Sequence, residues 1–278
     1  MPIHINRPLS VCVLGSSSSG NSTLVRSGDS ALLVDCGFSP AYLMTQLRSC
    51  DLGIEDLTGV LITHVHGDHV NERFVKKLIR AGIPIYCRHE IELNLQAGYD
   101  AFAHASHIGL LKTLHKNEHE LGDFHVESFE VPHDSPGGCF GYRISSESAG
   151  KIRKVTIATD IAHPTESSTR HFINSGLLVI ESNHDVNMLE NSGRPLWLKR
   201  RIREKGHLSN DQCAEIVLNV FDRSTDLPQS VMLAHVSQEC NTNALAVECV
   251  EEVTRDRGVN SVAIVETYPF KASKVVVA

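Results

Sequence analysis

The chain has 278 residues, of which 41% are hydrophobic and 21% charged, as is typical of a globular protein. Its formal net charge of −7 excludes a strongly basic nucleic-acid-binding protein, although it leaves room for a local basic patch. No apolar run approaches the roughly 18 residues that a membrane span requires, and the start of the chain has no export pattern, so we expect a cytoplasmic protein that contacts no membrane.

Short runs of β-branched and other apolar residues predict strands along the whole chain. These runs are bounded by Gly, Pro or Asp and lie at 9–14, 31–34, 59–63, 83–87, 125–131, 140–144, 155–158, 177–180, 230–234 and 261–265. Apolar residues recur at helical spacing at 70–78, 213–221 and 245–253. Ser209 and Gln212 have the pattern of a capping box before the second of these helices. The interleaved elements predict an α/β protein, and the lack of a composition break predicts one domain over residues 1–278.

None of the eight cysteines belongs to a CxxC pair, and several lie inside apolar runs such as SVCVLG and ALLVDCG. A cysteine in such a run behaves as a small buried hydrophobic residue. Because we expect a cytoplasmic protein, we interpret the cysteines as reduced thiols and not as a disulfide framework.

The segment THVHGDH places four metal-competent side chains within six residues, directly after an apolar run. His64 and His66 point the same way along a strand end because side chains alternate there. Gly67 permits a sharp turn that brings Asp68 and His69 back toward the same point. Imidazole and carboxylate groups suit zinc, iron or manganese, so the segment predicts a metal site.

This segment resembles the signature of the metallo-β-lactamase superfamily, and the resemblance extends over nearly the whole chain. By that resemblance, further ligands are His133 in VPHDSP, Asp160 in TIATDIAH and His235 in VMLAHVSQEC. The resemblance implies an αβ/βα four-layer sandwich, in which two mixed sheets pack together with helices outside. It also implies two divalent metal ions, for which zinc, manganese and iron are the candidates.

The resemblance divides seven ligands between the two ions. One ion would be held by His64, His66 and His133, the other by Asp68, His69 and His235, and Asp160 would bridge both. Asp35 in LLVDCG matches an early aspartate of the family, which would accept a ligand histidine's N–H and fix its tautomer. The alternative for Asp35 is ordinary turn formation before Gly37.

The segment GHLSN opens the capped helix and predicts a phosphate site, because a helix N-terminus offers unsatisfied N–H groups and partial positive charge. This segment resembles an element of the phosphodiesterase branch of the superfamily. There His207 would contact a phosphate oxygen or protonate the leaving oxygen, and Glu181 would orient it. The catalytic residues that we expect are Asp160, His207 and Glu181.

Further substrate contacts are expected on both sides of this site. The residues that we expect to bind substrate or phosphate are Ser18, Asn21, His184, His207, Ser209 and Asn210. Ser18 and Asn21 belong to a small-residue loop at 15–22, which we expect to be flexible, and Asn183 would line the cleft beside His184. Five Lys and Arg residues at 198–205 either contact a nucleic-acid backbone or form a solvated helix face.

The combination of motifs is similar to the WalJ/YycJ-type subgroup, whose members are regarded as DNA exonucleases or related phosphodiesterases. We therefore predict a dinuclear-metal-dependent phosphodiesterase, a nuclease of the exonuclease type acting on DNA or RNA through a metal-bridging hydroxide. The alternatives are a small cyclic-phosphate phosphodiesterase, a thioester or other hydrolase of the superfamily, and a non-catalytic metal-stabilised binding module. The expected partner is nucleic acid or another phosphodiester substrate, and a homodimer is a candidate assembly.

Overall fold

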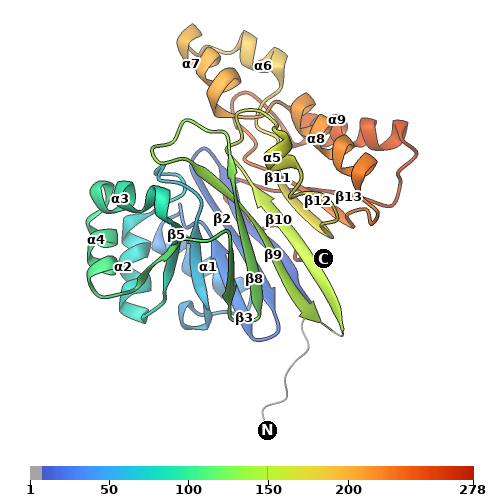
Figure 1. Cartoon of the computed structure of the whole chain (residues 1–278). Coiled ribbons are helices and arrows are strands. Elements are labelled where there is room, and N and C mark those ends of the chain that lie inside the picture. Colours follow the sequence, from blue (N-terminus) through green and yellow to red (C-terminus); the bar gives the residue numbers. More distant parts are fainter. Residues whose placement is uncertain (1–7, 149) are drawn as a thin grey trace.

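Two seven-stranded β-sheets form the inner layers of the protein, as Figure 1 shows for the computed structural model. The structure describes residues 8–148 and 150–278; residues 1–7 and 149, which the predictions about export and domain extent include, lie outside the described residues. The first sheet has the order β14 (Val276–Val277), β1 (Ser10–Ser17), β2 (Gly20–Ser27), β3 (Ser30–Val34), β4 (Gly59–Ile62), β5 (Ile85–Arg88) and β6 (Leu111–Leu114). The second has the order β13 (Ala263–Glu266), β12 (Ser230–Ala234), β11 (Leu177–Glu181), β10 (Lys151–Ala158), β9 (Cys139–Ser148), β8 (Phe124–Val131) and β7 (Glu118–Leu121).

Both sheets are mixed and buried on both faces over much of their area. In β1, Val11 and Val13 face the other sheet, whereas Cys12 and Leu14 face the outer helices. This alternation follows from the two-residue period of a strand. Because both faces are covered, the strand reads as a nearly continuous apolar run in the sequence.

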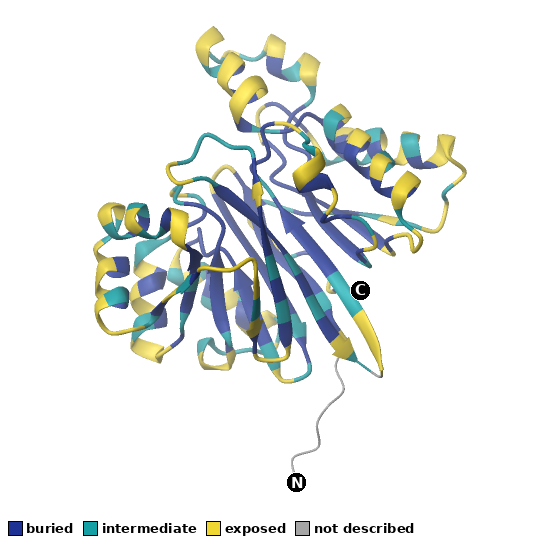
Figure 2. Ribbon diagram, viewed as in Figure 1, coloured by how far each residue is buried: buried dark blue, intermediate teal, exposed yellow. Residues whose placement is uncertain are grey.

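Helices cover the outer face of each sheet, which completes the four layers of the predicted αβ/βα sandwich (Figure 2). The first sheet is flanked by α1 (Pro40–Ser49), the short η1 (Ile54–Asp56), α2 (Glu72–Ala81), α3 (His89–Gly98) and α4 (Asp100–His107). The second is flanked by α5 (Glu166–Thr169), α8 (Asn210–Arg223) and α9 (Asn243–Asp256). A third group, α6 (Val186–Asn191), α7 (Leu196–Arg201) and the π-helical turn η2 (Ile202–Gly206), projects beyond the sheets. Within the described residues, no helix is both long and apolar enough to cross a bilayer.

All ten predicted strands and three predicted helices are present, and the capping box of Ser209 and Gln212 begins α8 as expected. The segment 15–22 differs from its prediction. It belongs to a hairpin in which β1 runs to Ser17 and β2 starts at Gly20, so the turn holds only Ser18 and Ser19. The polar sequence of β2 hides this strand, because its pairing with β1 and not its own apolar content defines it. One domain over residues 1–278 stays a prediction.

All eight cysteines are free thiols, and six of them are buried. Cys50, the C-cap of α1, is one of the two that are partly exposed. Contact with the Cys12 thiol lowers the pKa of Cys50 to about 7, with help from Ser49 and the Arg26 guanidinium. The other partly exposed thiol, Cys249, has its pKa raised to about 11 by burial and by Asp211.

Cys50 is therefore expected to be the thiol that iodoacetamide alkylates fastest at neutral pH. It lines a surface cavity of about 310 Å³, which gives the reagent access. Thiolate fraction and intrinsic nucleophilicity together predict a rate about 10- to 100-fold above that of Cys249. Peptide mass spectrometry over a pH series would measure both rates, with Cys50→Ser as the control. Equal rates at the two cysteines would contradict the prediction.

Candidate metal centre

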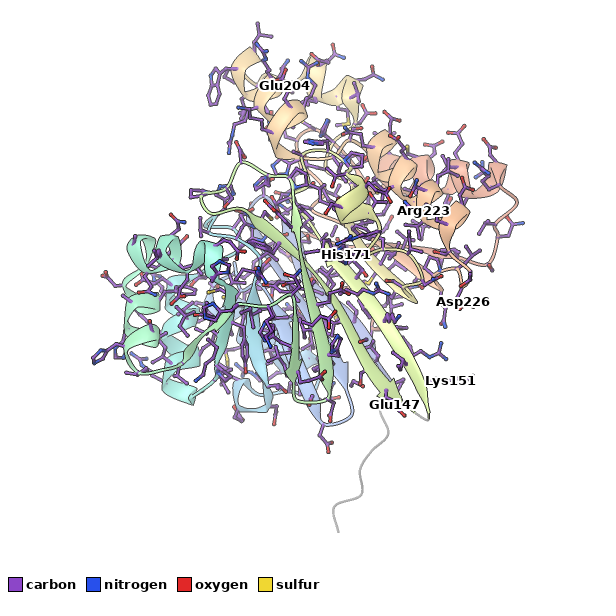
Figure 3. The ribbon with its side chains drawn as sticks, in the orientation of Figure 1. Glu147, Lys151, His171, Glu204, Arg223 and Asp226 are labelled. Atoms are coloured by element: carbon purple, nitrogen blue, oxygen red, sulfur yellow. The ribbon has the colours of Figure 1, made fainter. Side chains whose placement is uncertain are left out.

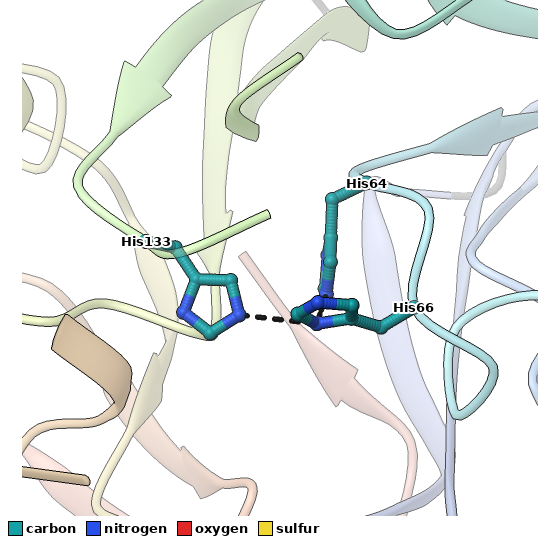
Figure 4. A group of neighbouring side chains, drawn as sticks. All are labelled: His64, His66 and His133. Carbon is teal, nitrogen blue, oxygen red and sulfur yellow. Dashed lines mark hydrogen bonds between the residues drawn. The ribbon is translucent and has the colours of Figure 1, made fainter. Parts of the chain in front are cut away.

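The seven predicted ligands converge at one edge of the two sheets. They lie in the segments that follow β4, β8, β10 and β12, close to the carboxyl ends of these strands. In Figure 4, His133 from the segment after β8 faces His64 and His66 from the segment after β4. Side chains separated by as many as 171 positions therefore lie within reach of shared cations.

The first group of candidate ligands consists of His64, His66 and His133. Nδ1 of His66 lies 3.1 Å from Nε2 of His64 and 3.2 Å from Nε2 of His133. Burial lowers the pKa of each of these histidines, which favours neutral rings whose lone pairs are available. Three ring nitrogens that face one another at this spacing fit a shared cation.

The second group consists of Asp68, His69, Asp160 and His235. Nε2 of His69 lies 3.0 Å from Oδ2 of Asp160, and Nε2 of His235 lies 3.4 Å from Oδ2 of Asp68. Although His69 Nε2 is this close, the buried Oδ2 of Asp160 has no hydrogen-bond partner among the described residues. A buried carboxylate oxygen without a hydrogen bond is costly unless a cation binds it, so the group fits a metal ion.

Asp160 lies between the two groups. Its Oδ1 atom is 3.7 Å from Nε2 of His133 in the first group and 3.8 Å from Nε2 of His235 in the second. Burial opposes ionisation of Asp160, but His235 and His69 outweigh it and hold the pKa of Asp160 well below its usual range. The carboxylate is thus charged, and its two oxygens can serve two cations at once.

Negative charge dominates the second group. Burial works against a charged His235, yet Asp160 and the other carboxylates around it raise the pKa of His235 to about 10. Burial also opposes ionisation of Asp68, and His69 overcomes it, so the pKa of Asp68 is lowered below its ordinary value. Such a potential favours binding of a multivalent cation.

Three residues of the site have a left-handed backbone directly after strands. Asp35, Asp160 and His235 have φ values of 61°, 58° and 55°. This conformation costs a residue with a Cβ about 1–3 kcal/mol and persists where the surrounding structure imposes it. Here it turns each side chain from its strand end into the centre.

A close backbone approach holds the histidine segment in place. The N–H of Asn21 donates to the Asp68 carbonyl at 2.7 Å, and that of Cys36 donates to the His69 carbonyl at 2.9 Å. Gly37 lies against the same segment, and a Cβ at this position would overlap the Asp68 carbonyl oxygen. The glycine after DC is therefore required by the proximity of two backbones.

Hydrogen bonds to the outer nitrogens of three histidines set their tautomers. His69 Nδ1 donates to Asp35 at 2.7 Å, which is the contact expected for Asp35. His133 Nδ1 donates to the Gly206 carbonyl at 2.9 Å, and His235 Nδ1 donates to Glu181 at 2.9 Å. Each bond keeps a proton on Nδ1 and directs Nε2 at the candidate cation positions, where a metal ion would take the place of any proton on Nε2.

Glu181 also orients His207. Its Oε1 atom is 2.9 Å from Nδ1 of His207 and 2.9 Å from Nδ1 of His235. Its Oε2 atom accepts the N–H groups of Ile161 and Leu208. Because Glu181 is fully buried and its oxygens are occupied, we assign it a positioning role and not contact with the substrate. His207 remains partly exposed, and its Nδ1 lies 3.6 Å from Asp160.

The α8 N-terminus differs from the prediction of a phosphate site. Ser209 and Gln212 bond each other's N–H groups through the capping box, and the N–H of Asn210 donates to the His184 carbonyl. The Asn210 side chain bonds Ser182 and Asn241. Most of the donors that would bind phosphate therefore have partners within the protein, and substrate contacts by Ser209 and Asn210 stay a prediction.

The other predicted substrate residues have separate positions. Asn21 is buried beside the second group, with its Nδ2 atom 3.0 Å from His69 Nε2, whereas Ser18 is exposed on the β1–β2 turn. Asn183 donates to the His235 carbonyl at 2.8 Å. His184 is buried, its Nδ1 has no hydrogen bond among the described residues, and burial lowers its pKa to about 4.

The basic run is less open than the sequence indicated. Lys199 is buried and donates to the Glu190 carbonyl, and Arg203 pairs with the Glu190 carboxylate. Arg201 pairs with Asp134, next to the candidate ligand His133. The run therefore lies near the centre, but it is held partly by ion pairs that its sequence does not reveal.

Sequence reasoning missed the Gly206 carbonyl and the hydroxyl of Ser16, whose Oγ accepts the His235 N–H at 2.8 Å. A backbone carbonyl carries no residue-specific signal. The serine lies in a run of four, and its neighbours do not distinguish it.

Comparison with known proteins supports this assignment of the fold. A family model described as a beta-lactamase superfamily domain matches residues 31–235. The chain is 31% identical to the exodeoxyribonuclease YycJ of Bacillus anthracis, over 88% of this chain and 89% of that protein. It is also 31% identical to the exodeoxyribonuclease WalJ of Streptococcus pneumoniae, over 84% of each chain. The crystal structure of the metallo-β-lactamase fold protein YhfI of Bacillus subtilis superposes with a TM-score of 0.68 at 20% identity, covering 98% of this chain and 100% of that one.

The matched segment contains all seven candidate ligands, from His64 to His235, and the YycJ and WalJ alignments extend over most of the chain. The chain therefore belongs to the metallo-β-lactamase superfamily of metal-dependent hydrolases, as a WalJ/YycJ-like member.

Proposed function

We propose that the protein is a two-metal phosphodiesterase that acts as an exonuclease on single-stranded or end-exposed nucleic acid. The observation that carries this proposal is the position of Asp160, whose carboxylate lies between two ligand groups beside the partly exposed His207. Similarity to proteins named exodeoxyribonucleases favours DNA as the substrate.

We propose that the two ligand groups hold zinc, manganese or iron, which imidazole and carboxylate ligands accept. When bound, the ions would supply a water of lowered pKa as nucleophile and positive charge for the phosphoryl oxygens. Asp160, which lies between the two ligand groups, would help to hold both ions. His207, held at Nδ1 by Glu181, can deliver a proton from Nε2 to the leaving oxygen.

A small cyclic-phosphate phosphodiesterase is the alternative within the same chemistry. The centre by itself does not distinguish the two substrates, because both present a phosphodiester to the same groups. The projecting, basic segment formed by α6, α7 and η2 favours a polymer, since a cyclic nucleotide has no chain to extend along it. A cytoplasmic location and a homodimer stay predictions.

A turnover assay tests the proposed function. Oligonucleotides labelled at the 5′ or 3′ end, single- and double-stranded, should be shortened stepwise in the presence of Mn²⁺, Zn²⁺ or Fe²⁺, and a chelator should stop the reaction. A cyclic nucleotide serves as the competing substrate. Faster hydrolysis of the cyclic nucleotide than of every oligonucleotide would reject the nuclease assignment and favour the alternative.

A further inference from the structure

The α6–α7 arm (residues 186–206) carries an apolar surface that the rest of the fold does not use. The arm projects from the top of the molecule in Figure 1, and its outer side is exposed in Figure 2. Its own small core contains Leu189 and Ile202, packed with Cys240. Leu196 and Trp197, at the start of α7, lie outside this core with 80% and 67% of their surface exposed.

Positive charge surrounds this apolar pair. The arm contains six Lys or Arg residues and two Glu residues, in a chain with a net charge of −7. Arg200 pairs with Glu204, and Arg203 with Glu190, through side chains that are between 43% and 73% exposed. Exposed pairs of this kind are weak and exchange readily, so these arginines can contact phosphates instead. Figure 3 labels Glu204 on the exposed side of the arm.

The arm is attached directly to the candidate metal centre. The Gly206 carbonyl at its end accepts from His133, and Arg201 pairs with Asp134, the next residue. The Lys205 carbonyl accepts the N–H of Asp134 at 3.2 Å. A cavity of about 190 Å³ leads from His133 to Lys205 at the base of the arm. The Lys205 ammonium has no hydrogen bond or ion pair among the described residues.

We propose that the α6–α7 arm is a docking element for single-stranded nucleic acid, in which Trp197 stacks on an unpaired base. The basic side chains of the arm contact the adjacent phosphates, and the strand passes Lys205 to place its end at the metal centre. Exposed aromatic and basic side chains together form the usual binding surface for a single strand, because every base has a face on which an indole can stack. The inference rests on the proposed nuclease function and names how its substrate is held.

Trp197 is the only tryptophan of the chain, so its fluorescence reports on the arm alone. Titration of the metal-loaded protein with a phosphorothioate-linked, single-stranded oligothymidylate should quench this emission saturably. A Trp197→Ala variant, followed by fluorescence anisotropy of a labelled oligonucleotide, should bind about 5- to 100-fold more weakly. Trp197→Phe should recover much of the affinity. Leu93→Ala on α3, where Leu93 is 76% exposed, is the matched control and should leave binding unchanged.

Kinetics separate this inference from the proposed function. Trp197→Ala should raise KM for single-stranded oligonucleotides and leave kcat unchanged, because stacking stabilises substrate and transition state equally. Hydrolysis of bis(p-nitrophenyl) phosphate, which carries no base, should not change. If the wild-type protein hydrolysed no phosphodiester, the proposed function would be rejected. The docking role of the arm would be rejected instead if the wild-type protein hydrolysed oligonucleotides normally but its emission did not change on titration, and if Trp197→Ala had the wild-type KM.

A second copy of the chain is the competing occupant of Trp197. In that case emission would depend on protein concentration and not on oligonucleotide, and Trp197→Ala would shift sedimentation from dimer to monomer. This result would overturn the docking proposal.

Discussion

Replacement of Asp160 by asparagine is expected to lower phosphodiester hydrolysis on the order of 10³-fold or more while the protein stays folded. Asparagine has the same shape but no charge, and its amide can offer only one oxygen to the two ligand groups. Oδ1 of Asp160 lies 3.7 Å from Nε2 of His133 and 3.8 Å from Nε2 of His235. The substitution therefore removes a carboxylate that both groups of candidate ligands share. Metal content measured by atomic emission should fall in parallel with activity.

Asp51→Asn is a matched control for this variant. Asp51 also has a left-handed backbone, with φ of 57°, but it follows α1 and is exposed. Any effect of placing asparagine in this conformation is therefore shared by the two variants. His66→Ala, which removes a candidate ligand and leaves Asp160 in place, should also abolish turnover. Wild-type activity in a well-folded Asp160→Asn or His66→Ala variant would remove the two-metal mechanism.

The residues that the structure brings together here were identified in the sequence by the THVHGDH segment and by resemblance to the metallo-β-lactamase superfamily, and they lie after strands. His133, Asp160 and His235 each come directly after a buried apolar run that identifies the strand before it. Sheet geometry then brings distant segments to one edge. The apolar runs were long enough to predict ten of the strands, whereas the arrangement into two mixed sheets came from the resemblance.

The sequence was least informative where hydrogen bonding and not apolar pattern decides the local structure. The polar strand β2 looked like a flexible loop, since only its pairing with β1 reveals it. The α8 N-terminus looked like an open phosphate site, yet Ser209 and Gln212 occupy each other's N–H groups. A capping box and a phosphate site compete for the same donors, and the sequence pattern predicted both at once.

The arm shows a third kind of difference. Its basic run indicated either a face that contacts a nucleic-acid backbone or a solvated helix face, but the structure pairs Arg201 with Asp134 and buries Lys199. These contacts join residues 67 positions apart or depend on the turn between α6 and α7, and neither has a local signal. The exposure of Trp197 has no local signal in the sequence either, because a tryptophan is highly buried on average.

Removal of the His207 imidazole is expected to have an effect that depends on the leaving group. His207→Ala should slow hydrolysis of an oligonucleotide about 10²- to 10⁴-fold, the usual contribution of a general acid. An alkoxide leaving group needs a proton, and His207 is the partly exposed histidine that Glu181 holds beside Asp160. Bis(p-nitrophenyl) phosphate should lose much less activity, because p-nitrophenolate leaves without protonation. His107→Ala, on the exposed surface of α4, is the control for loss of a histidine.

The Glu181→Gln variant tests whether Glu181 positions both His207, the proposed proton donor, and His235, a candidate ligand. In the wild type, Oε1 accepts from both histidines and Oε2 accepts two backbone N–H groups. The amide NH2 of glutamine cannot accept, so it must face N–H donors on one side or the other, and the charge that holds both histidines is lost. We expect oligonucleotide turnover to fall as in His207→Ala and metal affinity to fall about 10- to 100-fold as well, because a contact to a ligand histidine is weakened. His207→Ala should leave metal affinity intact, so metal titration of the two variants distinguishes proton delivery from ligand support. An equal loss on both substrates in His207→Ala would show that His207 binds the phosphate in the ground and transition states and does not protonate the leaving oxygen.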